Sequence, residues 1–186
     1  LKENIPLKWN IVYSSVIGAT TLVMAWFAQP YFQTIGIEDG IYYGLIGAGL
    51  NFAVALTAFY AHRIETSFKT SSILILLLAT LILCYLITSQ VATYWGLIAL
   101  AVFYFTRGIA TPILRDYMNR ETPSEMRATV MSIRSFIIRL IFASISPFLG
   151  YYADVYSVQE ALLLTALLFL MLGGFVLFLL LKSIRS

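Results

Sequence analysis

Charged residues are scarce in this sequence. Only 11% of the 186 residues are charged and 60% are hydrophobic, whereas a soluble domain usually carries about twice that share of charge. One small core cannot bury so many apolar side chains, which excludes an ordinary soluble domain and predicts a chain that has a lipid bilayer as its solvent. The net charge of +3 is too small and too localised to indicate nucleic-acid binding.

Groups that carry chemistry are scarce as well. The single cysteine, Cys84, lies in an apolar run, which excludes a disulfide framework. The sequence has one histidine, His62, and neither a His-Glu-x-x-His nor a Gly-x-Ser-x-Gly pattern, so we expect no metal, no cofactor and no intramembrane enzyme. All nine acidic residues fall at expected loops or helix ends, so no titrating acid is expected at membrane depth. The chain begins at Leu1 without an initiator methionine or a signal peptide, and we expect a fragment of a longer protein.

Long apolar runs are what the sequence has instead. A membrane-spanning helix needs about 20 mostly apolar residues. Positions 70 to 106 carry no charge, and one helix of that length, about 55 Å, is too long for a single crossing, so we expect a turn at Thr88–Gln90. Thr122 and Ser157 each precede a glutamate by three residues, the capping-box pattern of a helix start. The sequence therefore predicts a single all-α membrane domain over residues 1–186, with six spans at about 9–35, 40–61, 71–87, 91–117, 123–153 and 158–181.

The basic residues predict how the spans are oriented. Lysine and arginine collect on the cytoplasmic side of membrane proteins, and six alternating spans put every basic loop and terminus on one side. We therefore expect a multi-pass protein of the cell membrane with both termini in the cytoplasm. The basic side carries Lys2, Lys8, Arg63, Lys69, Arg115, Arg120, Arg127, Lys182 and Arg185, and the other side carries Glu38, Asp39, Asp154 and Glu160.

The spans differ in polarity. The third and sixth are almost wholly aliphatic, so we expect them to face lipid, and we expect the other four to face protein or water because they carry polar side chains. At about 100° per residue, small residues on the second and fifth spans form narrow stripes, which predict close helix contacts. The stripes consist of Gly40, Gly44, Gly47, Asn51 and Ala58, and of Ala128, Ser132, Ser135, Arg139, Ser146 and Gly150.

A weak internal repeat links the two halves of the chain. Residues 59–62 (Phe-Tyr-Ala-His) end the second span, and residues 151–154 (Tyr-Tyr-Ala-Asp) end the fifth span on the opposite membrane side. This arrangement fits an inverted repeat of three plus three helices. A chance match of four residues is the alternative.

Residues 115–132, 61–65 and 146–151 give the chain a resemblance to the C-terminal six-helix half of a major facilitator superfamily (MFS) transporter. Residues 115–132 look like the loop between the tenth and eleventh helices of that family. Residues 61–65 (Ala-His-Arg-Ile-Glu) resemble a degenerate Gly-x-x-x-Asp-Arg-x-Gly-Arg-Arg loop motif, and residues 146–151 (Ser-Pro-Phe-Leu-Gly-Tyr) resemble a weakened Gly-Pro-x-x-Gly-Gly motif of drug antiporters. The resemblance covers the whole chain. It implies that spans one and four line a central cavity, that two and five pack against an absent N-terminal half, and that three and six are peripheral.

Arginines at membrane depth are the first candidate site residues. Arg107 and Arg139 lie about 10 to 12 residues from the cytoplasmic loop, near the midplane, and we expect each to attract an anionic group of a solute or a carboxylate of the missing half. The alternative is that they snorkel toward the cytoplasm or bond to backbone carbonyls. Arg134 is closer to the loop, and we expect it to snorkel.

Other polar and aromatic residues complete the predicted sites. Further solute contacts are expected at Trp26, Gln29, Gln33, Asn51 and Tyr104, for which helix packing or interhelical hydrogen bonding is the alternative. Gating residues are expected at the cytoplasmic loops, where a solvated loop is the alternative. These gating residues are Arg63, Asp116, Asn119 and Arg127.

Together these features predict a secondary active transporter that moves a small solute across the membrane by alternating access, with the two arginines favouring an anionic solute. The partners would be the solute, the bilayer and the missing half, and a proton-driven mechanism would need its acid in that half. The alternatives are an efflux pump of the drug/proton antiporter type and a non-transporting membrane assembly or receptor module.

Overall fold

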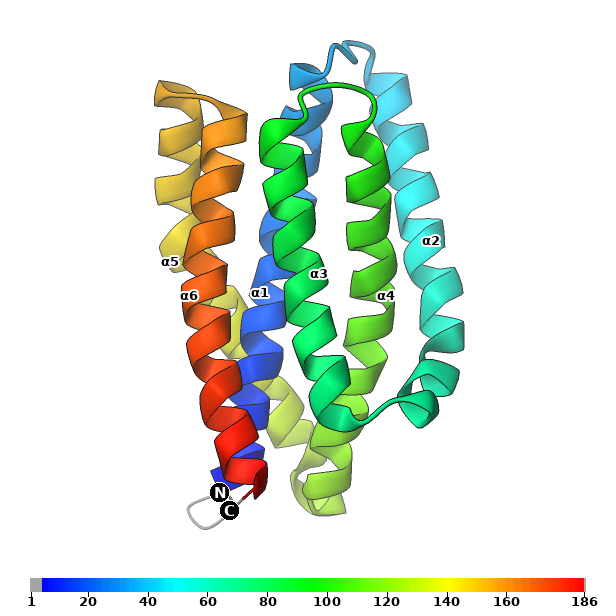
Figure 1. Ribbon diagram of the computed structural model, residues 1–186, viewed down its shortest axis with the longest axis vertical. Coiled ribbons are helices and arrows are strands. Elements are labelled where there is room, and N and C mark those ends of the chain that lie inside the picture. Colours follow the sequence, from blue (N-terminus) through cyan, green and yellow to red (C-terminus); the bar gives the residue numbers. More distant parts are fainter. Residues whose placement is uncertain (1–4, 186) are drawn as a thin grey trace.

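In the computed structural model, which describes residues 5–185, the chain forms six long helices (Figure 1). Each is long and apolar enough to cross a membrane, so the prediction of an all-α chain with six spans is confirmed at that level. The start of α1 and the end of α6 lie at the same end of the bundle, as an even number of crossings requires. The helices are α1 (Ile5–Thr34), α2 (Gly40–Ser67), α3 (Thr70–Gln90), α4 (Gly96–Glu121), α5 (Arg127–Val155) and α6 (Val158–Arg185).

The turn between α3 and α4 lies further along the chain than predicted. Thr88 and Ser89 donate hydrogen bonds to carbonyl oxygens one turn back, Thr88 to Cys84 at 2.9 Å and Ser89 to Leu86 at 2.8 Å. Both residues therefore stay within α3, and the chain turns over residues 91–95 before α4 begins at Gly96. Serine and threonine in a helix make such backward bonds without ending it.

One of the two predicted capping boxes is not a helix start. The backbone N–H of Glu160 donates to Ser157 Oγ at 3.1 Å, so Ser157 is at the start of α6 as predicted. Thr122 instead donates to the Met118 carbonyl at 2.6 Å and ends α4. A short 3₁₀ turn (Ser124–Met126) follows, and α5 begins at Arg127 rather than at 123. A threonine hydroxyl can accept a bond from the following turn or donate to the preceding one, and here it donates.

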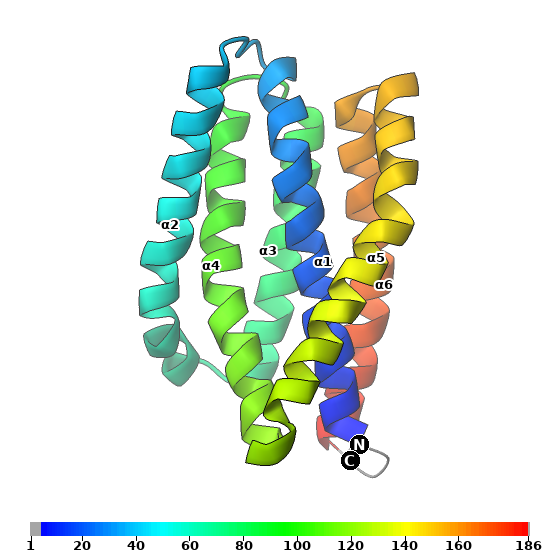
Figure 2. The same ribbon diagram turned by 180° about the vertical axis from the view of Figure 1, so that it is seen from behind.

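The helices pack in a largely reciprocal pattern, although α5 also contacts α6 whereas α2 has no matching contact with α3. α2 packs along α4 and α5 along α1, while α3 packs on α4, α6 packs on α1, and α3 and α6 contact each other. Figure 2 shows α4 and α1 in the middle of one face, with α2 and α5 at its two edges. α3 and α6 lie on the other face (Figure 1). We call the face formed by α1, α2, α4 and α5 the open face.

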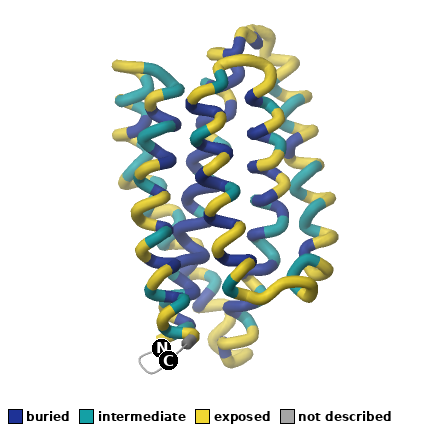
Figure 3. The backbone as a smooth tube through the Cα atoms, in the orientation of Figure 1, coloured by how far each residue is buried: buried dark blue, intermediate teal, exposed yellow. Residues whose placement is uncertain are grey.

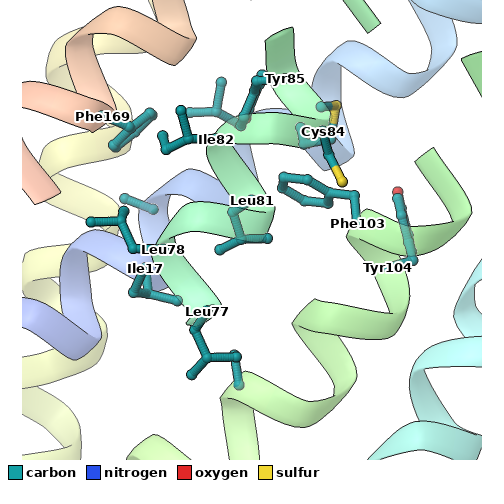
Figure 4. Close-up of a cluster of buried hydrophobic side chains, with 14 of the residues drawn as sticks. Ile17, Leu77, Leu78, Leu81, Ile82, Cys84, Tyr85, Phe103, Tyr104 and Phe169 are labelled. Carbon is teal, nitrogen blue, oxygen red and sulfur yellow. The ribbon is translucent and has the colours of Figure 1, made fainter. Parts of the chain in front are cut away.

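The apolar core lies where α1, α3, α4 and α6 meet. At its centre the rings of Tyr85 and Phe103 meet edge to face with centroids 5.3 Å apart (Figure 4). Such a pair adds about 1 kcal/mol beyond the burial of its apolar area. Around this pair lie Ile17, Leu77, Leu78, Leu81, Ile82 and Phe169.

Three tyrosine hydroxyls connect α1 with α3 and with the turn that follows α3. A phenol that is buried needs a hydrogen-bond acceptor, and each of these finds a backbone carbonyl on another segment, a bond worth about 1 kcal/mol. Tyr13 donates to the Leu74 carbonyl, Tyr85 to that of Thr20 and Tyr31 to that of Val91.

α2 and α5 are the least covered helices (Figure 3). α2 buries only Leu50 and Ala61, and α5 buries only Val130, Arg134 and Leu149. The small-residue stripes are part of the uncovered surface, since a Cβ atom built on one of their glycines would meet nothing within 4 Å among the described residues. The prediction of close helix contacts at the stripes therefore does not hold within this chain. The stripe glycines are Gly40, Gly44, Gly47 and Gly150.

Candidate functional site

The predicted solute contacts all lie on helices of the open face, but not in one pocket. A cavity of about 350 Å³ lies between α1 and α5, and Trp26 and Gln33 line it together with Phe142 and Ser146. The Trp26 side chain is 67% exposed, and its ring packs on Phe142 with centroids 5.8 Å apart. Ser146 Oγ has no hydrogen-bond partner within the described chain. An aromatic wall beside free hydrogen-bonding groups suits a small organic solute.

Two further predicted contacts from α1 and α2 stay outside this cavity. Gln29 is exposed on α1. Asn51 is exposed on α2, where its amide nitrogen donates to the Gly47 carbonyl of the same helix at 2.8 Å. That bond uses one of the two amide donors of Asn51 and leaves its amide oxygen available.

Arg107 is half-buried in the middle of α4. Its guanidinium carbon lies 5.7 Å from the centroid of the Tyr104 ring, a cation–π contact. Tyr104 itself is only 5% exposed, so it can position Arg107 but offers little surface to a solute. Among residues 5–185 no carboxylate pairs with Arg107, which leaves its charge available for an anion.

Arg139 occupies a separate place on α5. It is exposed and lines a groove of about 390 Å³ together with Ser132, Ser135 and Phe136. In the described part of the chain it too has no carboxylate partner. The structure thus brings together Trp26 with Gln33, and Arg107 with Tyr104, but not the two arginines.

Arg134 does not snorkel toward the end of the bundle, and that prediction is wrong. Its side chain is 6% exposed, and its Nε donates to Ser14 Oγ of α1 at 2.6 Å. Ser15 donates in turn to the backbone carbonyl of Arg134 at 3.4 Å and to that of Ile11 at 2.7 Å. The distance along α5 permits snorkelling, but α1 covers that path. The pair of serines on α1 was the signal in the sequence that could have indicated this contact.

We expect Ser14→Ala to lower the free energy of unfolding by about 1–3 kcal/mol, because the change leaves a buried guanidinium N–H without an acceptor. Denaturant unfolding in detergent measures the difference. Ser144→Ala is the control, since the Ser144 hydroxyl is exposed and donates only within its own helix, to Leu140. If both variants unfold like the parent, the Arg134–Ser14 contact does not stabilise the bundle.

The predicted basic residues gather at the end of the bundle where α1 begins and α6 ends (Figure 1). The opposite end carries the acidic residues predicted there, Glu38, Asp39, Asp154 and Glu160. Lys2 and the side chain of Arg185 lie outside the described residues. The basic residues described at this end are Lys8, Arg63, Lys69, Arg115, Arg120, Arg127 and Lys182. We call this the basic end.

An ion-pair cluster at the basic end connects α2 with α4. The Arg120 guanidinium lies 2.8 Å from the Glu65 carboxylate and also pairs with Asp116, one turn earlier on α4. His62 Nδ1 lies 4.0 Å from the same glutamate. The Glu65 side chain is only 8% exposed, whereas that of Arg120 is 60% exposed. The cluster therefore fixes the end of α2 against α4 through a partly buried carboxylate.

Of the predicted gating residues, only Asp116 belongs to this cluster. Arg63 lies over the Tyr60 ring of its own helix at 5.8 Å, and Arg127 donates to the Thr122 carbonyl at 3.3 Å. The backbone N–H of Thr122 donates to the backbone carbonyl oxygen of Asn119 at 3.4 Å, a bond that does not involve the Asn119 side chain. Sequence analysis missed Glu65 and Arg120. In the loop motif that residues 61–65 resemble, Glu65 stands where the motif has a glycine, and this acidic residue was the signal in the sequence. It was missed because the second span was predicted to end at 61, which put Glu65 in a loop, whereas α2 continues to Ser67.

Within residues 5–185, His, Cys, Asp and Glu side chains form no group of three that could hold a metal ion. Comparisons of the chain with models of protein families, with curated proteins and with solved structures find no match. Evidence on function therefore comes from the arrangement of the helices and their side chains.

Proposed function

We propose that this chain is one six-helix half of a secondary active transporter of the MFS type, which moves a small anionic solute by alternating access. The observation that carries the proposal is the open face. α2 and α5 have small and polar stripes that are uncovered within this chain. Between them, α1 and α4 carry Trp26, Gln33 and Arg107, the polar and aromatic groups that a solute path needs.

The reciprocal packing supports an inverted repeat. Exchanging α1–α3 with α4–α6 turns the α2–α4 contact into the α5–α1 contact and the α3–α4 contact into the α6–α1 contact, and it leaves the α3–α6 contact unchanged. The α5–α6 contact is an exception, because α2 and α3 do not pack together in the same way. The similar sequences 59–62 and 151–154 are less well matched, since α2 continues to Ser67 whereas α5 ends at Val155. Inverted repeats of this kind build many secondary transporters, with the solute site near the membrane midplane.

A second six-helix half is the partner that the uncovered surface of α2 and α5 fits. Small residues let the backbones of two membrane helices approach closely, and the glycines of both stripes have the space for such an approach. Covering this surface would enclose the cavity beside Trp26 and the groove beside Arg139. The solute path would then lie between two halves that rock against each other.

The arginines support an anionic solute. Arg107 and Arg139 both lie on helices of the open face, and among residues 5–185 neither is neutralised by a carboxylate. A charge at membrane depth is tolerated where it faces water, protein or a ligand of opposite charge. The basic end would face the cytoplasm of the cell membrane, and the Glu65–Arg120–Asp116 cluster would keep α2 and α4 together as this half moves.

Transport by the full-length protein reconstituted in vesicles tests the proposal. We expect saturable uptake of small organic anions. We also expect unlabelled solute inside the vesicles to accelerate the entry of labelled solute, because an alternating-access transporter returns to its starting conformation faster with solute bound than without it. Empty vesicles are the control. Export of lipophilic cations alone would favour the efflux-pump alternative, and solute binding without flux would favour a non-transporting module.

A further inference from the structure

The groove beside Arg139 on α5 has more hydrogen-bond donors than the arginine alone. Its volume is about 390 Å³, and the described residues that line it include no acid. We call it the Arg139 groove. Given the anionic solute of the proposed function, on which this step rests, these donors indicate which kind of anionic group the groove accepts. The lining residues are Met131, Ser132, Ser135, Phe136 and Arg139.

The three polar residues of the groove lie along one side of α5. At about 100° per residue, Ser132, Ser135 and Arg139 fall within about 60° of one another around the helix axis. All three are exposed. Long side chains on a helix point back toward its N-terminus, and both serines precede Arg139 by one to two turns. The guanidinium therefore extends toward the two hydroxyl groups.

The hydroxyl groups of these two serines are free to bind a ligand. Neither Ser132 nor Ser135 makes a side-chain hydrogen bond within residues 5–185. Serine in a helix commonly donates to the carbonyl one turn earlier, as Ser144 of the same helix does to Leu140 at 2.9 Å. Arg139 also has no ion pair or hydrogen bond in this part of the chain. The groove thus presents a guanidinium and two hydroxyls without partners.

This set of donors exceeds what a carboxylate needs. A carboxylate has two oxygens in one plane, and the planar fork of an arginine can bind both of them. A phosphoryl or sulfonyl group has a third terminal oxygen, which lies outside that plane and which the fork leaves without a donor. Hydroxyls on the side toward which Arg139 extends can supply that donor. The groove therefore matches a tetrahedral anionic group better than a planar one.

The depth and the apolar wall of the groove favour a small organic solute as the carrier of this group. Arg139 lies about 18 Å along α5 from its first residue, Arg127, which is near the membrane midplane. Phosphates of lipids lie at headgroup depth, outside the hydrocarbon core. Phe136 is 65% exposed beside the polar residues, and its ring can contact the apolar part of a solute.

We propose that the Arg139 groove binds the phosphoryl or sulfonyl group of a small organic solute and discriminates against carboxylates. The guanidinium of Arg139 donates to two oxygens of the group, and the hydroxyls of Ser132 and Ser135 donate to the third. Phe136 contacts the organic part. Arg107, which lies apart from the groove, attracts negative charge of either kind.

Ligand binding to the full-length protein in detergent tests this inference by calorimetry. The probes are benzoate, benzenesulfonate and phenyl phosphate, of which the first two share a ring and a single charge and differ in their number of oxygens. In a Ser132→Ala/Ser135→Ala double variant we expect the affinity for benzenesulfonate and phenyl phosphate to fall by roughly tenfold, the value of one charge-assisted hydrogen bond. The affinity for benzoate should be unchanged. No decrease, or an equal decrease for all three probes, would overturn the proposal.

Further variants assign the effect to the groove. Arg139→Gln should weaken binding of all three probes, whereas Ser144→Ala, which removes a hydroxyl bonded within its own helix, should weaken none. A greater serine-dependent loss for phenyl phosphate than for benzenesulfonate would identify the phosphoryl group as the preferred one, and the reverse would identify the sulfonyl group. If Arg139→Gln binds the probes like the parent but unfolds more easily, Arg139 pairs with an acid of the covering half, and the proposal is wrong.

Binding in the groove and transport can fail separately. Serine-dependent binding without flux would support the groove and count against the transporter. Flux of organic anions without serine-dependent binding would count against the groove alone. If none of the three probes binds to the parent protein, the groove is not an anion site, whatever the flux measurement shows.

Discussion

Replacing Arg107 by alanine is expected to reduce solute uptake by roughly 100-fold while the protein is still made and folded. The guanidinium is half-buried, is positioned over the Tyr104 ring and has no carboxylate partner among residues 5–185. A charge-assisted, bidentate contact to a carboxylate or phosphate is worth about 3 kcal/mol, and alanine removes it without adding a clash. The initial rate of uptake into vesicles, per amount of reconstituted protein, measures the effect.

Two further variants make the Arg107 experiment specific. Arg107→Lys keeps the charge but loses the planar fork, and we expect it to retain an intermediate rate. Arg115→Ala removes an exposed arginine two turns later on the same helix, and we expect uptake near that of the parent. If Arg107→Ala transports like the parent, Arg107 has no part in solute binding, and Arg139 becomes the remaining candidate for the anion contact.

Gly108→Ala is expected to destabilise the bundle by about 2–4 kcal/mol. α4 packs against α2 at this glycine so closely that a Cβ atom would lie 2.5 Å from the Val54 carbonyl oxygen and 3.0 Å from its Cα. Both atoms belong to the backbone of α2, so no side-chain rotation can relieve the clash. α2 would have to move away from α4, along the most extensive helix contact in the chain.

Gly174→Ala is the control for Gly108→Ala. Gly174 is also in the interior of a helix, and a Cβ atom built on it would meet nothing within 4 Å. Alanine favours helix over glycine by about 1 kcal/mol in water, so this variant should be neutral or slightly stabilising. Unfolding in detergent, followed by the loss of helical circular dichroism, measures both variants. Similar stability of the two variants would mean that α2 is not held closely to α4.

How far the sequence predicts this fold depends on which interaction decides each feature. The six spans follow from runs of apolar residues and from the places where charge returns, because transfer to lipid dominates every local preference. The start of α6 at Ser157 is likewise a local effect. Thr122 shows the limit, since a threonine hydroxyl can accept from the following turn or donate to the preceding one, and the sequence does not show that this one donates to Met118.

For the predicted site residues, too, the sequence indicates local features but not the contacts between helices. The sequence identifies Arg107 and Arg139 as arginines at membrane depth, but it does not show that they lie in separate places. The distance from Arg134 to the loop along α5 does not predict where its side chain lies, because α1 packs over Arg134 and supplies Ser14 as its hydrogen-bond partner. The small-residue stripes predicted close contacts of α2 and α5, yet the close contact of α2 is with Gly108 of α4, which belongs to neither stripe.

The three tyrosine bonds between α1, α3 and the turn after α3 limit how the bundle can deform. The acceptors are backbone carbonyls at fixed heights along the helices. A slide of α1 past α3 by one residue, about 1.5 Å, would stretch all three bonds together. The three bonds therefore oppose sliding of α1 along α3, so we expect these two helices and the turn after α3 to move together.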